Sequence, residues 1–334
     1  MKNNGVCIDM GSSKTAIYQK GTGIVLCEPS VVTLTRGDRK KIKEVGVNAK
    51  KLLGRVSDNS EVVRPIFESV VEDGFSASAM TEVFLNRITL SKLSARPYVL
   101  MNVPCGVDTT ALRRFERVLK EADVTDYDFV ESPILTALGL GIQLTSSPSF
   151  IIDIGGGTTE IAAVSADGII CGISVNMGGI SIDKMLKYYV EETFNLKIGD
   201  LTAEKLKLSI GSLYGDDELS MIVDGSDLYT GRPHAESLMG KDILKPITAF
   251  FDKIFQITGM VMAKLPAEVA ADVRRSGVYL SGGTSKMVGL EEYFYEKMGM
   301  RANISDNPEF AVVNGGGIML NDKGLLNKLK IDLK

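Results

Sequence analysis

A short sequence that occurs twice decides the fold of this chain. Residues 8–17 read Ile-Asp-Met-Gly-Ser-Ser-Lys-Thr-Ala-Ile, and residues 152–161 read Ile-Asp-Ile-Gly-Gly-Gly-Thr-Thr-Glu-Ile. Each copy continues into a second apolar stretch that begins with glycine, at Gly23 and at Gly168. An apolar run, a glycine turn and another apolar run are typical of a β-hairpin. The repeat, offset by 144 residues (152 minus 8), therefore predicts two similar domains that each open with a hairpin.

Predicted strands and helices alternate between and after the two copies. Val99–Val103 and Tyr127–Val130 have the apolar pattern of strands, and Asp108 is placed to cap the helix between them. The next helix is expected to have Ser132 as its N-cap and Pro133 as its first residue. Further helices are expected over residues 181–194, 202–213 and 245–265. This alternation predicts an α/β protein with two domains around a cleft.

The composition excludes several classes of protein. A chain of 334 residues that is 44% hydrophobic and has a net charge of −4 is expected to fold, as two domains. It has no basic stripe, so we expect no nucleic-acid partner. The cysteines, Cys7, Cys27, Cys105 and Cys171, lack the spacing of a metal site, and the single histidine, His234, nearly excludes chemistry that depends on a histidine base. No apolar leader precedes the first strand, so a cytoplasmic location is expected.

The two glycine turns predict a phosphate site. Phosphate loops need backbone N–H groups without bulky side chains in the way, as in residues 11–14 and 155–158. Each turn follows an aspartate, Asp9 or Asp153, and these carboxylates are expected to hold Mg²⁺ through water. A turn or capping role is the alternative for both aspartates. Neither the P-loop sequence nor the dinucleotide-binding glycine fingerprint is present.

These motifs together resemble the MreB family of bacterial actins, within the superfamily of actin, sugar kinases and heat-shock chaperone ATPases. The resemblance runs from about residue 5 to residue 320, and its motifs are 23–32, 103–106, 131–133, 153–160, 202–207 and 210–212. It implies an actin-like ATPase fold of two ribonuclease H-like domains around a nucleotide cleft. Domain I is expected to comprise residues 1–139 and about 310–334, with a small subdomain IB at about 33–66. Domain II is expected to comprise residues 140–309, with a small subdomain IIB at about 180–244.

The resemblance implies ATP or ADP and Mg²⁺ as cofactors, with Glu131 and Thr158 as catalytic residues and Asp9 and Asp153 as the metal-side acids. Glu131 lies at the end of a predicted strand and just before a helix, where a side chain can orient the attacking water. An acid that only favours the N-terminus of that helix is the alternative. The implied nucleotide-binding residues are Gly11, Ser12, Ser13, Lys14, Gly155, Gly156, Gly157, Thr158, Glu204, Lys205, Lys207, Gly282, Gly283, Thr284, Ser285 and Lys286.

Three positions depart from the family pattern. Lys14 adds a cation to a turn that is neutral in most relatives, and we expect it to offset phosphate charge and to change hydrolysis or ADP release. Thr284 stands where the family has a third glycine, and Ser132 precedes Pro133 where a glutamate is usual. These departures leave every group that the site needs in place and indicate a divergent member.

The resemblance implies a slow ATPase whose subunits stack head to tail into paired filaments and organise cell-wall elongation and rod shape. Leu90 and Leu93, flanked by cations, are expected to insert shallowly into the inner face of the cell membrane, which would make the protein peripheral there. Full burial of both leucines is worth at most about 3–6 kcal/mol, and an ordinary polar turn is the alternative. Membrane proteins of cell-wall elongation are the other expected partners. A non-polymerising ATPase that acts as a switch or assembly adaptor, and a small-molecule kinase, are the alternative functions.

Overall fold

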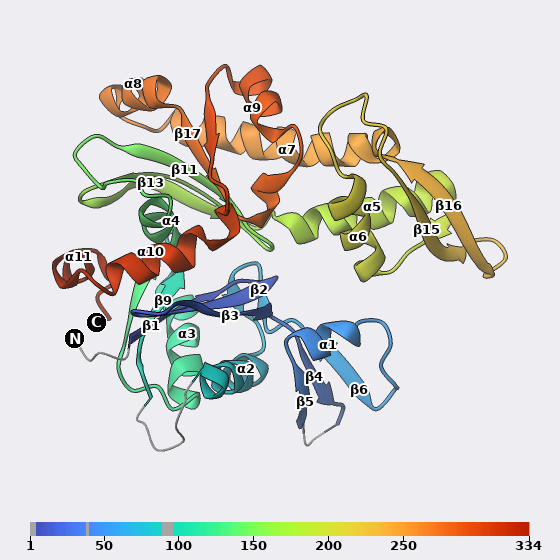
Figure 1. The fold of residues 1–334 in the computed structure, drawn as a ribbon, viewed down its shortest axis with the longest axis horizontal. Coiled ribbons are helices and arrows are strands. Elements are labelled where there is room, and N and C mark those ends of the chain that lie inside the picture. The colour runs from blue at the N-terminus through green and yellow to red at the C-terminus, as the bar shows by residue number, and fades with distance from the viewer. Residues whose placement is uncertain (1–4, 38–39, 89–95, 334) are drawn as a thin grey trace.

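The computed structural model describes residues 5–37, 40–88 and 96–333, and two five-stranded sheets form its centre (Figure 1). The first sheet has the order β10-β9-β1-β2-β3. Its strands are β1 (Gly5–Met10), β2 (Lys14–Gln19), β3 (Gly23–Pro29), β9 (Tyr98–Val103) and β10 (Tyr127–Glu131). Strand β1 is antiparallel to β2 and parallel to β9, so the hairpin is joined to a parallel half-sheet.

The second sheet repeats this arrangement with the order β13-β12-β11-β17-β18. Its strands are β11 (Ser149–Ile154), β12 (Thr159–Ser165), β13 (Gly168–Val175), β17 (Val278–Ser281) and β18 (Ala302–Ile304). Strand β11 is antiparallel to β12 and parallel to β17, as β1 is to β2 and β9. The sequence repeat therefore corresponds to a repeat of topology, and the prediction of two hairpin-led units is confirmed.

Two small sheets extend from the same side of the molecule, on the right of Figure 1. One contains β4 (Val32–Thr35), β5 (Ile42–Val45) and β6 (Ser60–Val63), with helix α1 (Val47–Lys51). The other contains β14 (Leu196–Lys197), β15 (Ser220–Asp227) and β16 (Pro233–Met239), with α5 (Gly179–Phe194) and α6 (Asp200–Ile210). A hairpin of β7 (Ile66–Phe67) and β8 (Val70–Val71) leads from the first small sheet back towards the first large sheet.

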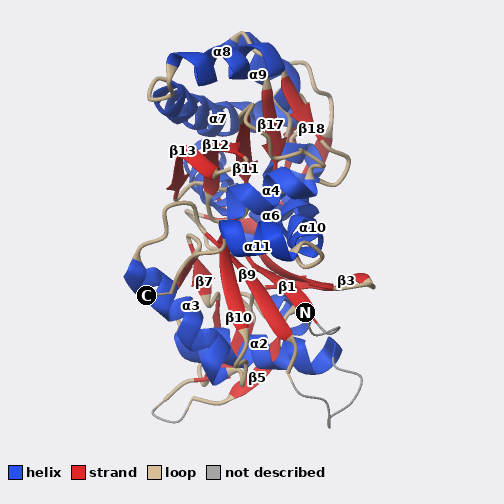
Figure 2. Ribbon diagram, turned by 90° about the vertical axis from the view of Figure 1, so that its left-hand side faces the viewer, coloured by secondary structure: helices blue, strands red, loops and turns tan. Residues whose placement is uncertain are grey.

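The remaining helices cover the large sheets in layers (Figures 1 and 2). Helices α2 (Gly74–Ile88) and α3 (Thr109–Glu121) pack on the first sheet, and α7 (Gly240–Met262), α8 (Ala267–Ser276) and α9 (Leu290–Met298) on the second. Helices α4 (Ser132–Gly139), α10 (Ala311–Met319) and α11 (Lys323–Leu329) contribute to the core between the sheets. Among the helices that the structure describes, none combines the length and apolar character needed to cross a bilayer.

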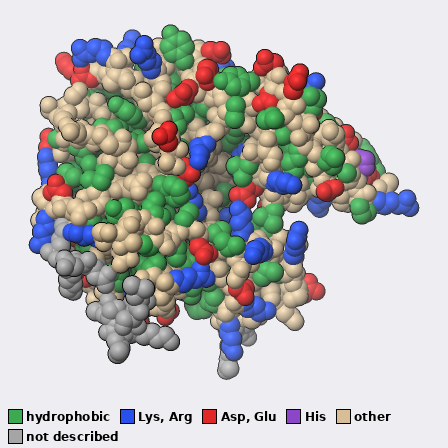
Figure 3. All heavy atoms as spheres, viewed as in Figure 1, with side chains coloured by type: hydrophobic (Ala, Val, Ile, Leu, Met, Phe, Trp, Pro, Cys, Tyr) green, Lys and Arg blue, Asp and Glu red, His purple; other side chains and the backbone are tan. Residues whose placement is uncertain are grey.

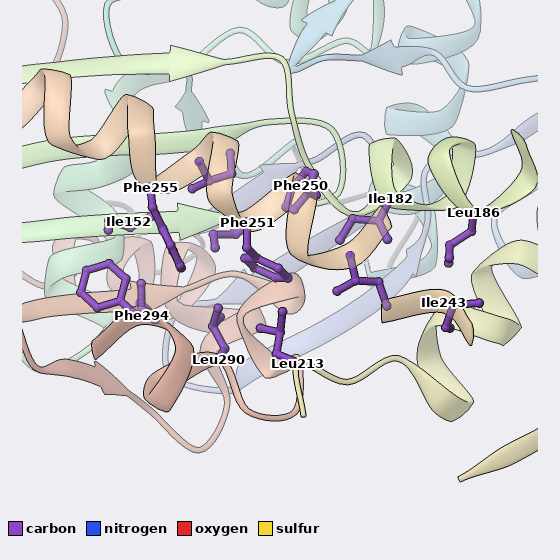
Figure 4. Close-up of a cluster of buried hydrophobic side chains, with 14 of the residues drawn as sticks. Ile152, Ile182, Leu186, Leu213, Ile243, Phe250, Phe251, Phe255, Leu290 and Phe294 are labelled. Carbon is purple, nitrogen blue, oxygen red and sulfur yellow. The ribbon is translucent and has the colours of Figure 1, made fainter. Parts of the chain in front are cut away.

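The largest core lies between α7, α9 and the second sheet (Figure 4). Aromatic rings meet edge to face here: the centroids of Phe250 and Phe251 on α7 are 5.2 Å apart, and those of Phe255 on α7 and Phe294 on α9 are 5.0 Å apart. The buried positions of α7 recur every three or four residues, which is the periodicity that predicted a helix there. This packing fixes the second sheet and the turns at its end.

The helix caps were predicted with mixed success. Asp108 caps α3 as expected, because its side chain accepts a hydrogen bond from Ala111 N at 2.8 Å. The prediction of Ser132 as the N-cap of α4 is wrong, since the helix begins at Ser132 itself. The Ser132 hydroxyl instead donates to Val103 O at 3.0 Å and accepts from Asn102 Nδ2 at 3.0 Å. Partners on the neighbouring strand β9 therefore compete successfully with the capping contact.

Candidate functional site

A cavity of about 350 Å³ lies between the two large sheets and opens towards the small ones, within the size range of sites for small ligands. In Figure 3 the opening is visible as a notch on the right, with basic side chains at its edges. Most of the predicted site residues line it. They are Asp9, Gly11, Ser12, Ser13, Lys14, Asp153, Gly155, Gly156, Gly157, Thr158, Glu204, Lys207, Gly282, Gly283, Thr284 and Lys286.

The two glycine turns face each other in van der Waals contact. A Cβ atom added at Gly156 would lie 2.5 Å from Ser13 Cβ, and one added at Gly157 would lie 2.3 Å from Ser12 Oγ. Both turns close in the same way, with Gly11 N donating to the carbonyl three residues later at 3.1 Å and Gly155 N doing so at 2.9 Å. Glycine is therefore required in the second turn by the approach of the first. The pair forms a narrow site with backbone on two sides.

Ser69, which the sequence analysis missed, joins the two turns. Its backbone N–H donates to Ser12 Oγ at 3.2 Å, and its hydroxyl is hydrogen-bonded to the Thr158 hydroxyl at 2.6 Å. Ser69 and Glu68 form the tip of the β7–β8 hairpin with φ of 55° and 49°. Two-residue hairpin turns of this kind usually contain glycine or asparagine, so the sequence carried no signal for this turn. The strained tip indicates that its position between the turns matters.

Asp9 and Asp153 lie at the base of the cavity, where Asp153 is buried and Asp9 is partly buried. Burial and the Asp153 charge raise the pKa of Asp9 to about 7, although Lys14 and Asn102 oppose the shift. Burial likewise raises the pKa of Asp153 to about 6, against Lys14 and a hydrogen bond that Thr136 Oγ1 donates at 2.8 Å. Nearby cations therefore do not fully offset these two carboxylates. Within the described residues no cluster of three or more metal-binding side chains is found.

Substitution of Asp9 tests this electrostatic reading. A carboxyl whose folded pKa exceeds its unfolded value of about 3.9 makes the free energy of unfolding fall as pH rises through the interval up to about 7. Asp9→Asn removes that cost. In urea unfolding without nucleotide we expect the variant to gain about 1–3 kcal/mol over wild type near pH 8, and nothing near pH 4. A variant that is no more stable than wild type near pH 8 would contradict the assignment.

The part of the cavity bordered by α6 is lined by paired charges. Lys207 Nζ donates to Gly179 O at 2.8 Å and forms an ion pair with Asp183 at 2.7 Å. Glu204, three residues earlier on the same face of α6, forms an ion pair with Lys50 of α1 at 2.7 Å. Because α1 and α6 belong to the two different small sheets, this ion pair spans the opening of the cavity.

Two further cations line the cavity near the turn between β18 and α10. Lys14 Nζ lies 4.3 Å from the centroid of the Phe310 ring, in the geometry of a cation–π contact. Lys286 Nζ lies 2.7 Å from Glu309 Oε1. Lys14 thus supplies positive charge beside the glycine turns, as the sequence suggested.

Three predicted residues are not on the cavity wall. Glu131 Oε1 accepts a hydrogen bond from Gly106 N at 2.6 Å, which holds the carboxylate against the loop after β9. Lys205 is exposed, because one residue along α6 turns the side chain by about 100° from Glu204. Ser285 is buried, and its hydroxyl donates to Gly282 O at 2.7 Å, which supports the turn from behind.

Other lining residues lay outside the sequence predictions. Among them are Arg64, Ser69, Asn102, Glu160, Asp183, Leu208, Met287, Val288 and Glu309. Only Glu160 had a signal, because it ends the 153–160 motif that contains the second glycine turn. The proposed membrane residues Leu90 and Leu93 fall outside the described residues.

Known proteins are similar to this chain over nearly its whole length. A family model described as MreB/Mbl protein matches residues 3–328. The chain is 33% identical over 323 residues to the cell shape-determining protein MreB of Escherichia coli (strain K12), covering 95% of this chain and 93% of that protein. It is 29% identical over 328 residues to the cell shape-determining protein Mbl of Bacillus subtilis (strain 168), covering 97% and 98%.

Solved structures share the fold over nearly the whole chain. MreB5 of Spiroplasma citri bound to ADP matches with a TM-score of 0.91 and 26% identity, covering 98% of both chains. The same protein bound to AMPPNP also gives a TM-score of 0.91. The MamK double helical filament matches in fold, with a TM-score of 0.76 and 17% identity over 96% of this chain and 99% of that one. The predicted actin-like α/β fold is confirmed, and the chain belongs to the MreB/Mbl family.

Proposed function

We propose that this protein binds ATP and ADP in the cavity, hydrolyses ATP and assembles into filaments that organise cell-wall elongation and rod shape. The observation that carries the proposal is the pair of facing glycine turns, with two aspartates of raised pKa at their base. The cell shape-determining relatives and the ADP- and AMPPNP-bound Spiroplasma structures support it.

Each side chain has a role in this proposal. The turns at 11–14 and 155–158 donate backbone N–H groups to the phosphates, and Lys14 offsets their charge. Glu204 and Lys207 flank the nucleoside. Asp9 and Asp153 hold Mg²⁺ through its waters, and the ion supplies positive charge to the phosphates when bound. The residues from Gly282 to Lys286 form the remaining wall of the cavity, and Ser285 supports this wall from behind. Lys205 is exposed, so any contact that it makes with the nucleotide would be at the edge of the cavity.

Hydrolysis depends on the placement of water near the last phosphate. We propose that Glu131 and the Thr158 hydroxyl orient that water, because phosphoryl transfer is governed by positioning and charge stabilisation. Glu131 would have to exchange its hydrogen bond with Gly106 for one with water, or share it. Catalytic contacts of this kind often tighten only when substrate is bound.

The domain division proposed for this chain follows the two sheets. Domain I would comprise residues 1–139 and about 310–334, with subdomain IB at about 33–66. Domain II would comprise residues 140–309, with subdomain IIB at about 180–244. Nucleotide between the domains would favour the closed form, and the Lys50–Glu204 pair would add to that closure.

The proposed partners are further copies of this chain, stacked head to tail into protofilaments that pair. A repeated heterologous contact gives an open filament because it does not close on itself. The inner face of the cell membrane and membrane proteins of cell-wall elongation are proposed as secondary partners. The alternative is an ATPase that stays monomeric and acts as a switch or assembly adaptor.

Sedimentation with ATP, with ADP and without nucleotide tests the filament proposal. We expect the full chain to pellet in a nucleotide-dependent manner and to release phosphate. With anionic liposomes added, we expect more protein in the pellet, and a loss of this gain in Leu93→Asp, since weak contacts add up along a filament. A protein that hydrolyses ATP but stays monomeric under every condition would favour the switch and reject the filament.

A further inference from the structure

Glu160 is a buried carboxylate that the proposed function does not yet use. It lies on β12, where its cross-strand neighbours are Asp153 on β11 and Ser174 on β13. The residue is only 5% exposed, yet it lines the cavity. Burial raises the pKa of Glu160 to about 7, and the charges of Asp153 and Glu131 add to this shift. Burying a carboxylate costs folding free energy unless hydrogen bonds compensate for the lost water.

Both oxygens of Glu160 accept hydrogen bonds. Ser174 Oγ donates to Oε1 at 2.8 Å, and the Cys105 backbone N–H donates to Oε2 at 2.9 Å. Cys105 lies in the loop that follows β9 of the first sheet, so the second contact joins the two sheets. The next backbone N–H along this loop, that of Gly106, donates to Glu131 Oε1 at 2.6 Å. Two consecutive N–H groups thus hold one carboxylate from each sheet.

The loop is also seated tightly against the second sheet. A Cβ atom added at Gly172 of β13 would lie 2.7 Å from Cys105 Sγ and 2.8 Å from Ala162 Cβ. Gly106 has a φ of 67°, a left-handed conformation that favours glycine directly after its N–H group. The loop therefore has little room to shift relative to β12 and β13.

We propose that Glu160 is a positioning residue for nucleotide hydrolysis. By holding the 104–106 loop on the second sheet, it fixes where the Glu131 carboxylate stands relative to the 155–158 turn, two residues before Glu160 itself. The inference rests on the proposed ATPase function. The arrangement links the water-orienting acid of the first sheet to the phosphate turn of the second, so that both move together. A misplacement of about 1 Å can cost about 100-fold in rate.

Phosphate release by the full chain tests the proposal. Glu160→Ala is expected to lower kcat about 10- to 100-fold, while the dissociation constant for a fluorescent ATP analogue stays within about threefold. Glu160→Gln should recover part of the loss, because its amide oxygen can still accept from Cys105 N–H. Glu236→Ala, a partly exposed glutamate on β16, is the matched control and should behave as wild type. A normal kcat in Glu160→Ala would overturn the inference.

A double-mutant cycle separates positioning from a general loss of structure. If Glu160 acts through Glu131, the double variant with both alanines hydrolyses ATP no more slowly than Glu131→Ala alone. Losses that multiply would show that Glu160 acts independently of Glu131 and would overturn the inference. Thermal unfolding of each variant checks that the fold is intact, and Glu160→Gln carries the comparison if the alanine variant does not fold.

Amide hydrogen exchange measures the protection of the Cys105 and Gly106 N–H groups and does not depend on ATP hydrolysis. In the nucleotide-free protein, exchange at Cys105 and Gly106 should accelerate in Glu160→Ala and stay unchanged in Glu236→Ala. Unchanged exchange would overturn the inference while leaving the proposed function intact. A wild type that binds nucleotide but hydrolyses none would instead overturn both the proposed function and the inference.

Discussion

Glu131→Ala is expected to reduce ATP hydrolysis by about 10²- to 10³-fold, the range typical of losing a group that positions or activates a water. ATP binding should change little, because Glu131 is not on the cavity wall and its carboxylate is held by Gly106 N at 2.6 Å. The loss should therefore fall on kcat rather than on nucleotide affinity. Phosphate release at saturating ATP, together with titration of a fluorescent nucleotide, measures the two quantities separately.

Glu131→Gln is the informative companion variant. Its amide oxygen can accept the Gly106 hydrogen bond, so the loop should keep its place while the negative charge is lost. If charge matters for activating water, the glutamine variant should be nearly as slow as the alanine variant. If Glu131 only favours the N-terminus of α4, hydrolysis would be normal in both, and each would lose about 0.3–1 kcal/mol of stability instead. That outcome would reject Glu131 as a catalytic residue.

The sequence predicted the parts of the site that depend on backbone. The two Asp-x-Gly turns could be recognised because close approach of backbone to a ligand restricts the choice of residue, and the repeat placed the turns in equivalent positions. The contact between the turns, with an added Cβ at Gly157 only 2.3 Å from Ser12 Oγ, explains why residues 156 and 157 of the second turn are glycines. Close approach of backbone can therefore be recognised in the sequence, because it requires glycine.

Side-chain contacts between distant segments could not be recognised in this way, because no local sequence pattern indicates them. Ser69 reaches Ser12 and Thr158 from a hairpin tip that lacks glycine, so no turn signal marked it. The Lys50–Glu204 pair depends on how the two small sheets face each other. A motif can identify Glu204, but only the tertiary structure shows its partner. The wrong cap at Ser132 has the same origin, because partners on β9 overrode a local preference.

The glycines of α10, in the core between the sheets, are another case in which close approach of backbone restricts the choice of residue. Helices α4 and α10 cross so closely that a Cβ atom added at Gly315 would lie 1.8 Å from Leu135 O. The contact is reciprocal, since a Cβ at Gly139 of α4 would lie 1.8 Å from Ala311 O. Each helix therefore places a glycine against a backbone carbonyl of the other helix. On both helices the glycine lies four residues, about one turn, after the residue whose carbonyl is contacted. Both contacted atoms are backbone carbonyl oxygens, which cannot rotate away as a side chain could. The clash can therefore be relieved only by moving a helix.

Gly315→Ala is therefore expected to destabilise the protein, although the same change in an open helix stabilises it. Separating the helices would disturb a core shared by both sheets, and overpacking of this kind costs about 1–3 kcal/mol or somewhat more. Gly259→Ala on α7 is the matched control, because its added Cβ would meet nothing within 4 Å; it should gain about 0.5–1 kcal/mol from helix propensity. Urea unfolding of both variants decides the matter. If Gly315→Ala is as stable as the control, α4 and α10 can move apart freely. The close crossing would then not hold the two sheets together.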